Sequence, residues 1–252
     1  MRKAQFFYLL RRGLLSGGLN FIKEGLVMAS KFTTQGLSFP AQGSAEFNGS
    51  SDYIQTNNAF SHTKHTIAAW VYPNGSGTRQ IFDARDAASD GINIQFTSSN
   101  TIAYGVNTTD VIPNDTFSDW FYLSVTYNGS TARVYANGSE IGSASSSQTI
   151  STTNDAVIGS RSYSTKTNYF NGNFANFAIW NRALSSDEIN SVMWKSYEAL
   201  SGAESNGLQA WYSLDDISSP AASLANMEQL ATDKNATIEN KAAITAAINA
   251  LS

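Results

Sequence analysis

A single stretch decides the fold: WFYLSVTYNGSTARVYANG, residues 120–138. In its first half, residues 121–127, apolar side chains occupy every second position, which is the period of a β-strand that buries one face. Asn128-Gly129 and Asn137-Gly138 close the two extended runs. Asn-Gly suits tight hairpin turns because both residues tolerate positive φ. The stretch therefore predicts consecutive antiparallel strands.

The sequence on both sides of this hairpin repeats the pattern of short extended runs and turn residues. Twelve strand candidates result: 45–47, 53–56, 66–72, 80–85, 92–96, 101–106, 120–127, 131–136, 139–144, 156–160, 173–181 and 208–215. Four more Asn-Gly pairs, beginning at residues 48, 74, 171 and 206, predict further tight turns. Parallel strands need crossovers of a dozen or more residues, so connections this short predict an all-β fold, an antiparallel β-sandwich or jelly roll.

Composition agrees with this fold class. The 252 residues include 34 serines, 21 threonines, 23 asparagines and 18 glycines, which favour turns over long helices. Cysteine is absent, so packing alone must stabilise the fold. A net charge of −4 without a basic stripe argues against nucleic-acid binding, and no apolar run is long enough for a transmembrane span.

Helical patterns follow the predicted strands. Ser185 and Glu188 form a capping-box sequence, and an apolar face leads from there to Gly202. After Ser219-Pro220 the chain is rich in alanine, with apolar residues at helical spacing in two groups. We therefore expect a C-terminal helical tail at residues 218–252, whose apolar stripe packs on the domain or forms an oligomer surface.

The N-terminal segment differs in charge from the rest of the chain. Residues 1–31 have a balance of +5, whereas the remaining 221 residues have a balance of −9. Leucine and isoleucine recur at helical spacing between residues 15 and 26. This arm, residues 1–35, packs on its own domain, docks into an assembly or lies on a membrane surface. A cleaved secretion leader is a further alternative, although Arg11 and Arg12 interrupt its apolar run.

Four pieces of residues 36–217 occur in an order that resembles one family. They are AEFNGSSDYI (45–54), TIAAWV (66–71), the hairpin at 120–138, and FNG (170–172) continuing to AIWNRALS (178–185). Together they resemble the concanavalin A-like, laminin G-like jelly rolls, over about residues 45–200. The resemblance implies the fold of that family and leaves its ligand open. GLQAWYSLD (207–215) looks like a strand that opens the family's domain, yet it stands after the closing helix.

Calcium is the one cofactor that the resemblance raises. Family members often carry an Asp in a Gly-x-Ile-Asp run of the closing strand, but Ala175 stands at that place and cannot ligate a metal. The densest remaining acids are Asp83, Asp86 and Asp90, which predict either calcium ligands or, as we favour, turn residues. We expect no other cofactor.

Catalysis has little support in the sequence. The glucanase branch of the superfamily needs two Glu flanking an Asp on one strand, and no Glu-x-Asp-x-x-Glu occurs. His62 and His65 are the two histidines, and we interpret them as solvated loop residues rather than a zinc pair. We therefore expect a protein that is not an enzyme.

Binding is the remaining class of function. Jelly rolls of this kind bind through loops or a sheet face, where exposed aromatic rings and amide or hydroxyl groups recognise sugars. The candidate contact residues are Tyr72, Asn74, Arg161, Tyr163, Asn168 and Tyr169. The alternative is that each tyrosine only covers the core.

Two hypotheses follow. In the first, the chain is a structural or adhesion protein that displays the jelly roll on a large assembly, such as a phage virion, as a decoration, fibre or capsid-associated protein. Its partners would then be other virion or surface proteins, contacted through the arm and the tail, with further copies of the chain and glycans as additional partners. In the alternative, the chain is a secreted or cell-surface lectin. Either hypothesis places the protein on a virion or an extracellular surface.

Overall fold

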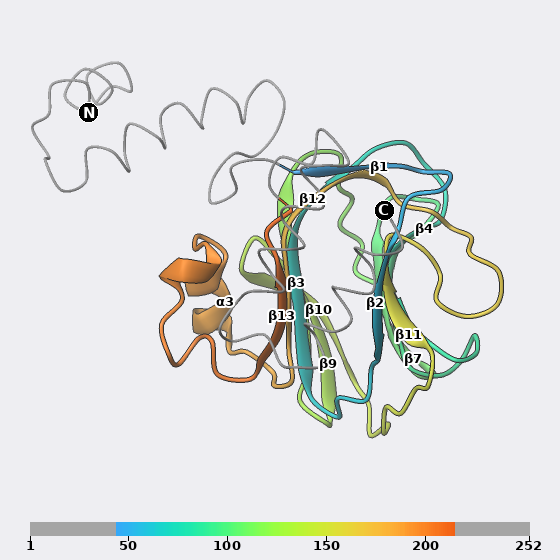
Figure 1. Ribbon diagram of the computed structural model, residues 1–252. Coiled ribbons are helices and arrows are strands. Elements are labelled where there is room, and N and C mark those ends of the chain that lie inside the picture. The colour runs from blue at the N-terminus through green and yellow to red at the C-terminus, as the bar shows by residue number, and fades with distance from the viewer. Residues whose placement is uncertain (1–43, 215–252) are drawn as a thin grey trace, which may run out of the picture.

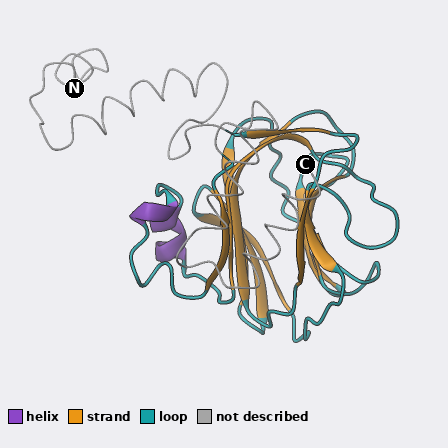
Figure 2. Ribbon diagram, viewed as in Figure 1, coloured by secondary structure: helices purple, strands orange, loops and turns teal. Residues whose placement is uncertain are grey.

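The structure is a computed structural model of the chain and describes residues 44–214. The predicted arm at 1–35 and the predicted tail at 218–252 lie outside these residues. Within the described range, thirteen strands form two antiparallel sheets that pack face to face, and one short helix lies beside them (Figures 1 and 2). The prediction of an all-β antiparallel sandwich is confirmed.

Sheet A has seven strands. In spatial order they are β1 (Ala45–Asn48), β12 (Asn171–Trp180), β3 (His65–Pro73), β8 (Phe121–Tyr127), β9 (Thr131–Ala136) and β10 (Ser139–Ser145), and β13 (Leu208–Tyr212) pairs with β12. The hairpin at 120–138 supplies β8 and β9. Asn137 and Gly138 both have positive φ, 50° and 81°, so this Asn-Gly pair forms the expected tight turn between β9 and β10.

Sheet B has six strands, in the order β2 (Ile54–Ala59), β11 (Asp155–Ile158), β4 (Arg79–Ala84), β5 (Ile92–Phe96), β6 (Ile102–Val106) and β7 (Thr109–Val111). Each of the twelve predicted strands has a counterpart, with bounds that differ by a few residues. The three-residue β7 was not predicted, because so short a run shows no alternation.

The other Asn-Gly pairs behave differently from the one at residue 137. Asn171-Gly172 begins β12, so the prediction of a turn there is wrong. At Asn48 and Asn128 the turn is closed by the side chain: each Oδ1 accepts hydrogen bonds from the backbone N–H groups two and three residues later. Asparagine is favoured at such turns because its side chain imitates a backbone carbonyl.

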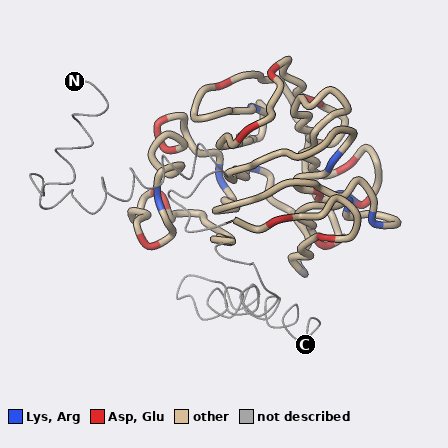
Figure 3. The backbone as a smooth tube through the Cα atoms, turned by 90° about the horizontal axis from the view of Figure 1, so that it is seen from above, with Lys and Arg blue, Asp and Glu red and all other residues tan. Residues whose placement is uncertain are grey.

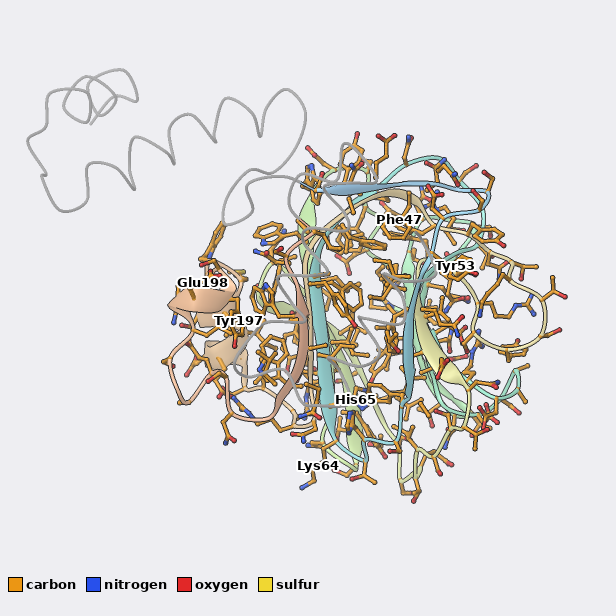
Figure 4. The ribbon with its side chains drawn as sticks, in the orientation of Figure 1. Phe47, Tyr53, Lys64, His65, Tyr197 and Glu198 are labelled. Atoms are coloured by element: carbon orange, nitrogen blue, oxygen red, sulfur yellow. The ribbon has the colours of Figure 1, made fainter. Side chains whose placement is uncertain are left out.

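The main core fills the space between the two sheets. Its aromatic centre is made of phenylalanines that are fully buried, Phe82, Phe96, Phe170, Phe174 and Phe177. The rings of Phe170 and Phe174 stack with centroids 4.1 Å apart, and Phe47 meets Phe174 edge to face at 5.0 Å. Figure 4 shows Phe47 at one end of the sandwich and His65 at the other.

A second core lies on the outer face of sheet A. Helix α3 (Ser186–Val192) and the 3-10 turn η1 (Tyr197–Ala199) cover this face (Figure 1). Trp70, Tyr122 and Trp180 project from the sheet and pack against Ile189 and Val192 of α3 and other apolar side chains. Both faces of β8 are therefore buried, whereas the sequence pattern predicted one buried face.

Helix α3 begins as predicted and ends earlier. The Ser185 side chain accepts from Glu188 N, and the Glu188 carboxylate accepts from Ser185 N, which completes the capping box. The helix ends after Val192, and residues that were expected to continue it form a turn and η1.

The covering segment is fastened by a buried acid, Glu204. Its carboxylate accepts from Ser191 Oγ at 2.6 Å, from Ser201 N at 2.7 Å and from Lys195 Nζ. Burial alone would raise the pKa of Glu204, but the hydrogen bonds from Lys195, Ser191 and Ser201 outweigh it and lower the pKa to about 2. The carboxylate therefore stays charged and holds α3 to the segment that precedes β13.

Both ends of the described chain meet on the same edge of β12. Ala45 of β1 pairs with Phe174, while Ser213, just after β13, accepts a 2.9 Å hydrogen bond from Asn176 N. Only Ala175 separates these two contacts. β13 and β1 thus run one after the other along β12, and together they complete this edge of sheet A.

Candidate functional site

The predicted contact residues fall into two groups. Arg161, Tyr163, Asn168 and Tyr169 lie together in the loop between β11 and β12, residues 159–170, which extends from sheet B (yellow in Figure 1). Tyr72 and Asn74 lie at the end of β3 in sheet A. Tyr72 packs 5.7 Å from Trp120 beside the second core, and Asn74 N donates to Asn171 O. The structure therefore brings four of the six predicted residues together.

Backbone hydrogen bonds fix the base of this loop. Phe170 N donates to Gly159 O at 2.8 Å, and Arg161 N donates to Thr167 O at 3.1 Å. Asn168 adopts a positive φ of 54°, and its carbonyl accepts from Gln80 N at 2.7 Å. Asparagine tolerates this conformation better than most residues do. The loop is thereby held against β4, and its side chains are placed by the sandwich.

Two arginine side chains contact the ring of Tyr163. Its ring centre lies 5.0 Å from the guanidinium carbon of Arg85 and 5.1 Å from that of Arg161. Arg85 is itself paired with the buried Asp83, and Arg161 donates from Nε to Thr167 Oγ1 at 2.9 Å. Cation-π contacts of this kind stabilise the loop. With two cations against it and its side chain half-buried, Tyr163 offers less free ring to a ligand than an exposed tyrosine would.

Tyr53 provides a freer aromatic surface. It precedes β2, is 42% exposed, and its ring centre lies 6.5 Å from that of Tyr169 and 5.6 Å from Lys166 Nζ. Figure 4 shows Tyr53 beside the loop on the sheet B side, away from α3. The sequence analysis did not single out Tyr53, because a tyrosine next to a strand gives no sign of which loop it will meet. We call Tyr53, Tyr169 and Lys166 the Tyr53 surface.

The three predicted metal ligands are engaged separately. Asp83 is fully buried, pairs with Arg85 and accepts from Ser162 Oγ at 2.5 Å. Asp90 Oδ1 accepts from the backbone N–H groups of Asp86 and Ala87, both at 2.8 Å. These last bonds close a turn, in line with the turn interpretation.

Asp86 binds a different segment. Its carboxylate accepts from Thr153 N, Thr153 Oγ1 and Asn154 N. Burial would raise the pKa of Asp86, but the hydrogen bonds from Asn154 and Thr153 lower it. Among residues 44–214, no three His, Cys, Asp or Glu side chains are grouped so that they could hold a metal ion.

The histidine interpretation is wrong for His65. Its side chain is buried in the main core, where Nε2 shares a 2.6 Å hydrogen bond with the Tyr104 hydroxyl. Burial lowers the pKa of His65 to about 3, so the ring is neutral at pH 7. His62 is half-buried and packs on Phe60 with ring centroids 4.8 Å apart. We conclude that His65 is a structural residue.

No helix in the part of the chain that the structure describes is long and apolar enough to cross a membrane.

No curated protein matches the chain. Among the solved structures that are similar to it are two with TM-scores of 0.50 or more. One is from a protein of Bacteroides ovatus proposed to bind carbohydrate. It is 13% identical with a TM-score of 0.57, and the aligned part covers 69% of this chain and 51% of the Bacteroides ovatus chain. The other is the CBM40 of the Ruminococcus gnavus IT-sialidase. It is 13% identical with a TM-score of 0.50, and the aligned part covers 61% of this chain and 97% of the CBM40 chain.

The chain spans about half the length of the Bacteroides ovatus protein. At such identities the two likenesses concern the fold alone. A match to a family model is evidence for the family itself. The model Laminin_G_3, described as the concanavalin A-like lectin/glucanases superfamily, matches residues 48–190, which is more than half of the chain. The predicted resemblance is thereby confirmed. By this match and by its two-sheet antiparallel sandwich, the chain belongs to the concanavalin A-like lectin/glucanases superfamily.

Proposed function

We propose that this domain is a carbohydrate-binding module without catalytic activity, and that glycans bind at the Tyr53 surface. The observation that carries the proposal is the 42% exposed ring of Tyr53, held beside Tyr169 and a loop rich in hydroxyl and amide groups. Sugars are recognised by such surfaces, because the ring packs on apolar C–H groups while polar neighbours bind hydroxyls. The descriptions of the two similar structures support the same class of ligand.

The acids of the described domain support a binding role over hydrolysis. A retaining glycosidase needs two carboxyl groups about 5 Å apart, one of them able to give up a proton. The buried acids among residues 44–214, Asp83 and Glu204, are paired with Arg85 and Lys195. Both carboxylates are therefore committed to holding the fold together.

Replacing Tyr53 with alanine should weaken glycan binding at least about tenfold, or about 1.4 kcal/mol, because the exposed ring on which the sugar packs is lost. The full chain would first be screened on a glycan array, with and without calcium. Affinity for the best glycan would then be measured by calorimetry for the wild type and the Tyr53→Ala variant.

Trp194→Ala is the matched control for this experiment. Trp194 is 49% exposed and packs on Trp70 on the α3 side, so its loss should leave binding unchanged. Equal weakening by both variants would rule out the Tyr53 surface as the binding site. No binding to any glycan in either condition would contradict the proposed function itself.

As a second function we propose that the flanking segments attach the domain to a larger assembly, such as a phage virion. Their charge supports this, since residues 1–31 carry +5 and the rest of the chain carries −9. The meeting of Ala45 and Ser213 on β12 supports it too, because both flanking segments then leave the domain at one place.

Truncation tests this second proposal. The full chain should form oligomers or bind its host particle, and residues 36–217 alone should stay monomeric, because the apolar stripes that the sequence predicts in the arm and tail would be missing. Light scattering measures the mass of both proteins, and cosedimentation measures binding to the particle. Equal behaviour of the two proteins would overturn the proposal.

A further inference from the structure

The loop beside Tyr53 carries positive charge in an acidic domain. Residues 156–186 contain Arg161, Lys166 and Arg182 and no Asp or Glu, although the chain after residue 31 has a balance of −9. Figure 3 shows acidic positions in many other parts of the described backbone, with fewer basic ones among them. Arg161 and Lys166 both belong to the loop at 159–170, so the charge is concentrated at the proposed binding surface.

Arg161 is held in place but not neutralised. Its Nε and Nη2 both bond the Thr167 hydroxyl, and its guanidinium lies over Tyr163. A guanidinium has five N–H donors, and these contacts use two of them. Among the residues that the structure describes, no carboxylate lies within ion-pair distance of Arg161, and its side chain is half-buried. Donors therefore remain for a ligand.

Lys166 is the cation of the Tyr53 surface. Its Nζ donates to Ser162 O at 3.1 Å and stands 5.6 Å from the centre of the Tyr53 ring. Burial lowers the pKa of Lys166, while the charges of Asp83 and Asp155 raise it. Neither acid forms an ion pair with Lys166 in the described part of the chain.

The two neighbouring acids already have other partners. Asp83 binds Arg85 and Ser162, and Asp155 Oδ2 accepts from Gln55 Nε2 at 2.8 Å. Arg85 thus has a carboxylate in an ion pair, whereas Arg161 and Lys166 form no ion pair with any residue of 44–214. Lys166 lies beside the exposed Tyr53 ring, and Arg161 belongs to the same loop, where it bonds Thr167, the residue after Lys166. An anion bound in this loop would complete the surface.

We propose that the glycan bound at the Tyr53 surface carries an acid group, either a sugar carboxylate or a sulfate ester, which Arg161 and Lys166 bind. This inference rests on the proposed function and specifies its ligand. Tyr53 supports the sugar ring, and the anionic oxygens accept charge-assisted hydrogen bonds, which are stronger than those between neutral groups. Arginine in addition can bind a carboxylate or sulfate through two donors at once.

The test uses the full chain and pairs of saccharides that differ in charge alone. Sialyllactose is compared with lactose for the carboxylate, and a sulfated heparin oligosaccharide with its desulfated form for the sulfate. We expect the acidic member of one pair to bind at least about tenfold more tightly. Raising the salt concentration should weaken that binding, because added ions screen exposed charges. The pair that responds identifies the acid group.

Variants connect the effect to the two cations. Lys166→Gln and Arg161→Gln should each weaken binding of the acidic saccharide about tenfold, and so remove most of its advantage over the neutral counterpart. Lys166→Arg should restore most of the affinity. Lys64→Gln is the matched control, because Lys64 is exposed at the opposite end of the sandwich from Tyr53 (Figure 4). Unchanged unfolding midpoints would confirm that each variant is folded.

The outcomes separate this inference from the proposed function. If acidic and neutral saccharides bind equally, and both Gln variants match the wild type while Tyr53→Ala weakens binding, the acidic ligand is overturned and the proposed function stands. If no saccharide binds, both are overturned. A loss of affinity with Lys64→Gln equal to that with Lys166→Gln would mean that net charge acts and not this site, which also overturns the inference.

Discussion

Replacing Trp180 with alanine should lower the free energy of unfolding by about 3–5 kcal/mol. Trp180 is fully buried at the end of β12, and its ring meets that of Trp211 edge to face at 6.3 Å. Its Nε1 donates a 2.8 Å hydrogen bond to Glu204 O. Alanine would leave a cavity in the second core and a buried carbonyl without a partner, and both effects destabilise the folded state.

Urea unfolding followed by circular dichroism measures this loss. Trp194→Ala removes the same side chain from a position that is 49% exposed, and we expect it to cost about 1 kcal/mol or less. If Trp180→Ala cost as little as this control, the α3 segment would not unfold together with the sandwich. The second core would then be a separate, weaker unit.

Lowering the pH from 7 to 5 should cost the domain about 2 kcal/mol of unfolding free energy through His65 alone. Burial holds the pKa of His65 at about 3 in the folded state, against its ordinary value of 6.5. Below pH 6.5 the unfolded chain binds a proton at this ring and the folded chain does not. Stability is therefore complete above pH 6.5 and is lost progressively as the pH falls toward 3.

The structure explains why protonation is resisted. The His65 ring lies among Phe60, Tyr104 and Tyr127, with centroid distances of 5.3, 6.1 and 5.8 Å. Within residues 44–214 no acid forms an ion pair with the ring. The backbone of His62 favours the protonated ring, but burial outweighs it and the charge of His62 adds to the effect of burial. A charged imidazolium would therefore be buried there without an ion-pair partner.

His65→Gln isolates this effect. Glutamine does not titrate, so the fall in unfolding free energy between pH 7 and 5 should shrink by about 2 kcal/mol in the variant, even if its stability at pH 7 is lower. Burial also lowers the pKa of His62, which contributes in the same direction, so His62→Gln serves as the comparison. An unchanged pH profile in His65→Gln would contradict the assignment.

Local pattern was sufficient to predict most of the sheet framework. Alternation and turn residues placed the strands, because a one-residue shift would move every side chain of a strand to the other face. The second core was within reach of the same reasoning. Trp70, Tyr122 and Trp180 occupy the face of sheet A opposite the main core, and a solvated face has no need of three large aromatic residues.

The candidate site was harder to predict. The loop at 159–170 was recognised by its tyrosines and amides, yet Tyr53 lies more than a hundred residues earlier in the chain and meets Tyr169 only in the folded domain. The aspartates illustrate the same difficulty. Three acids in eight residues look like one cluster, but Asp83 points to Arg85 and Ser162 while Asp86 binds Thr153 and Asn154. Spacing in the sequence did not reveal these partners.

The edge formed by β13 and β1 has a mechanical consequence. Ser213 and Ala45 contact residues of β12 that only Ala175 separates, so the described chain begins and ends at neighbouring points of one edge. Tension between the two flanking segments would act at this point. It would peel β13 from one side and β1 from the other, one hydrogen bond at a time, whereas strands pulled lengthwise share the load among all their bonds. The place where the chain enters and leaves the domain is thus also where it would begin to open under force.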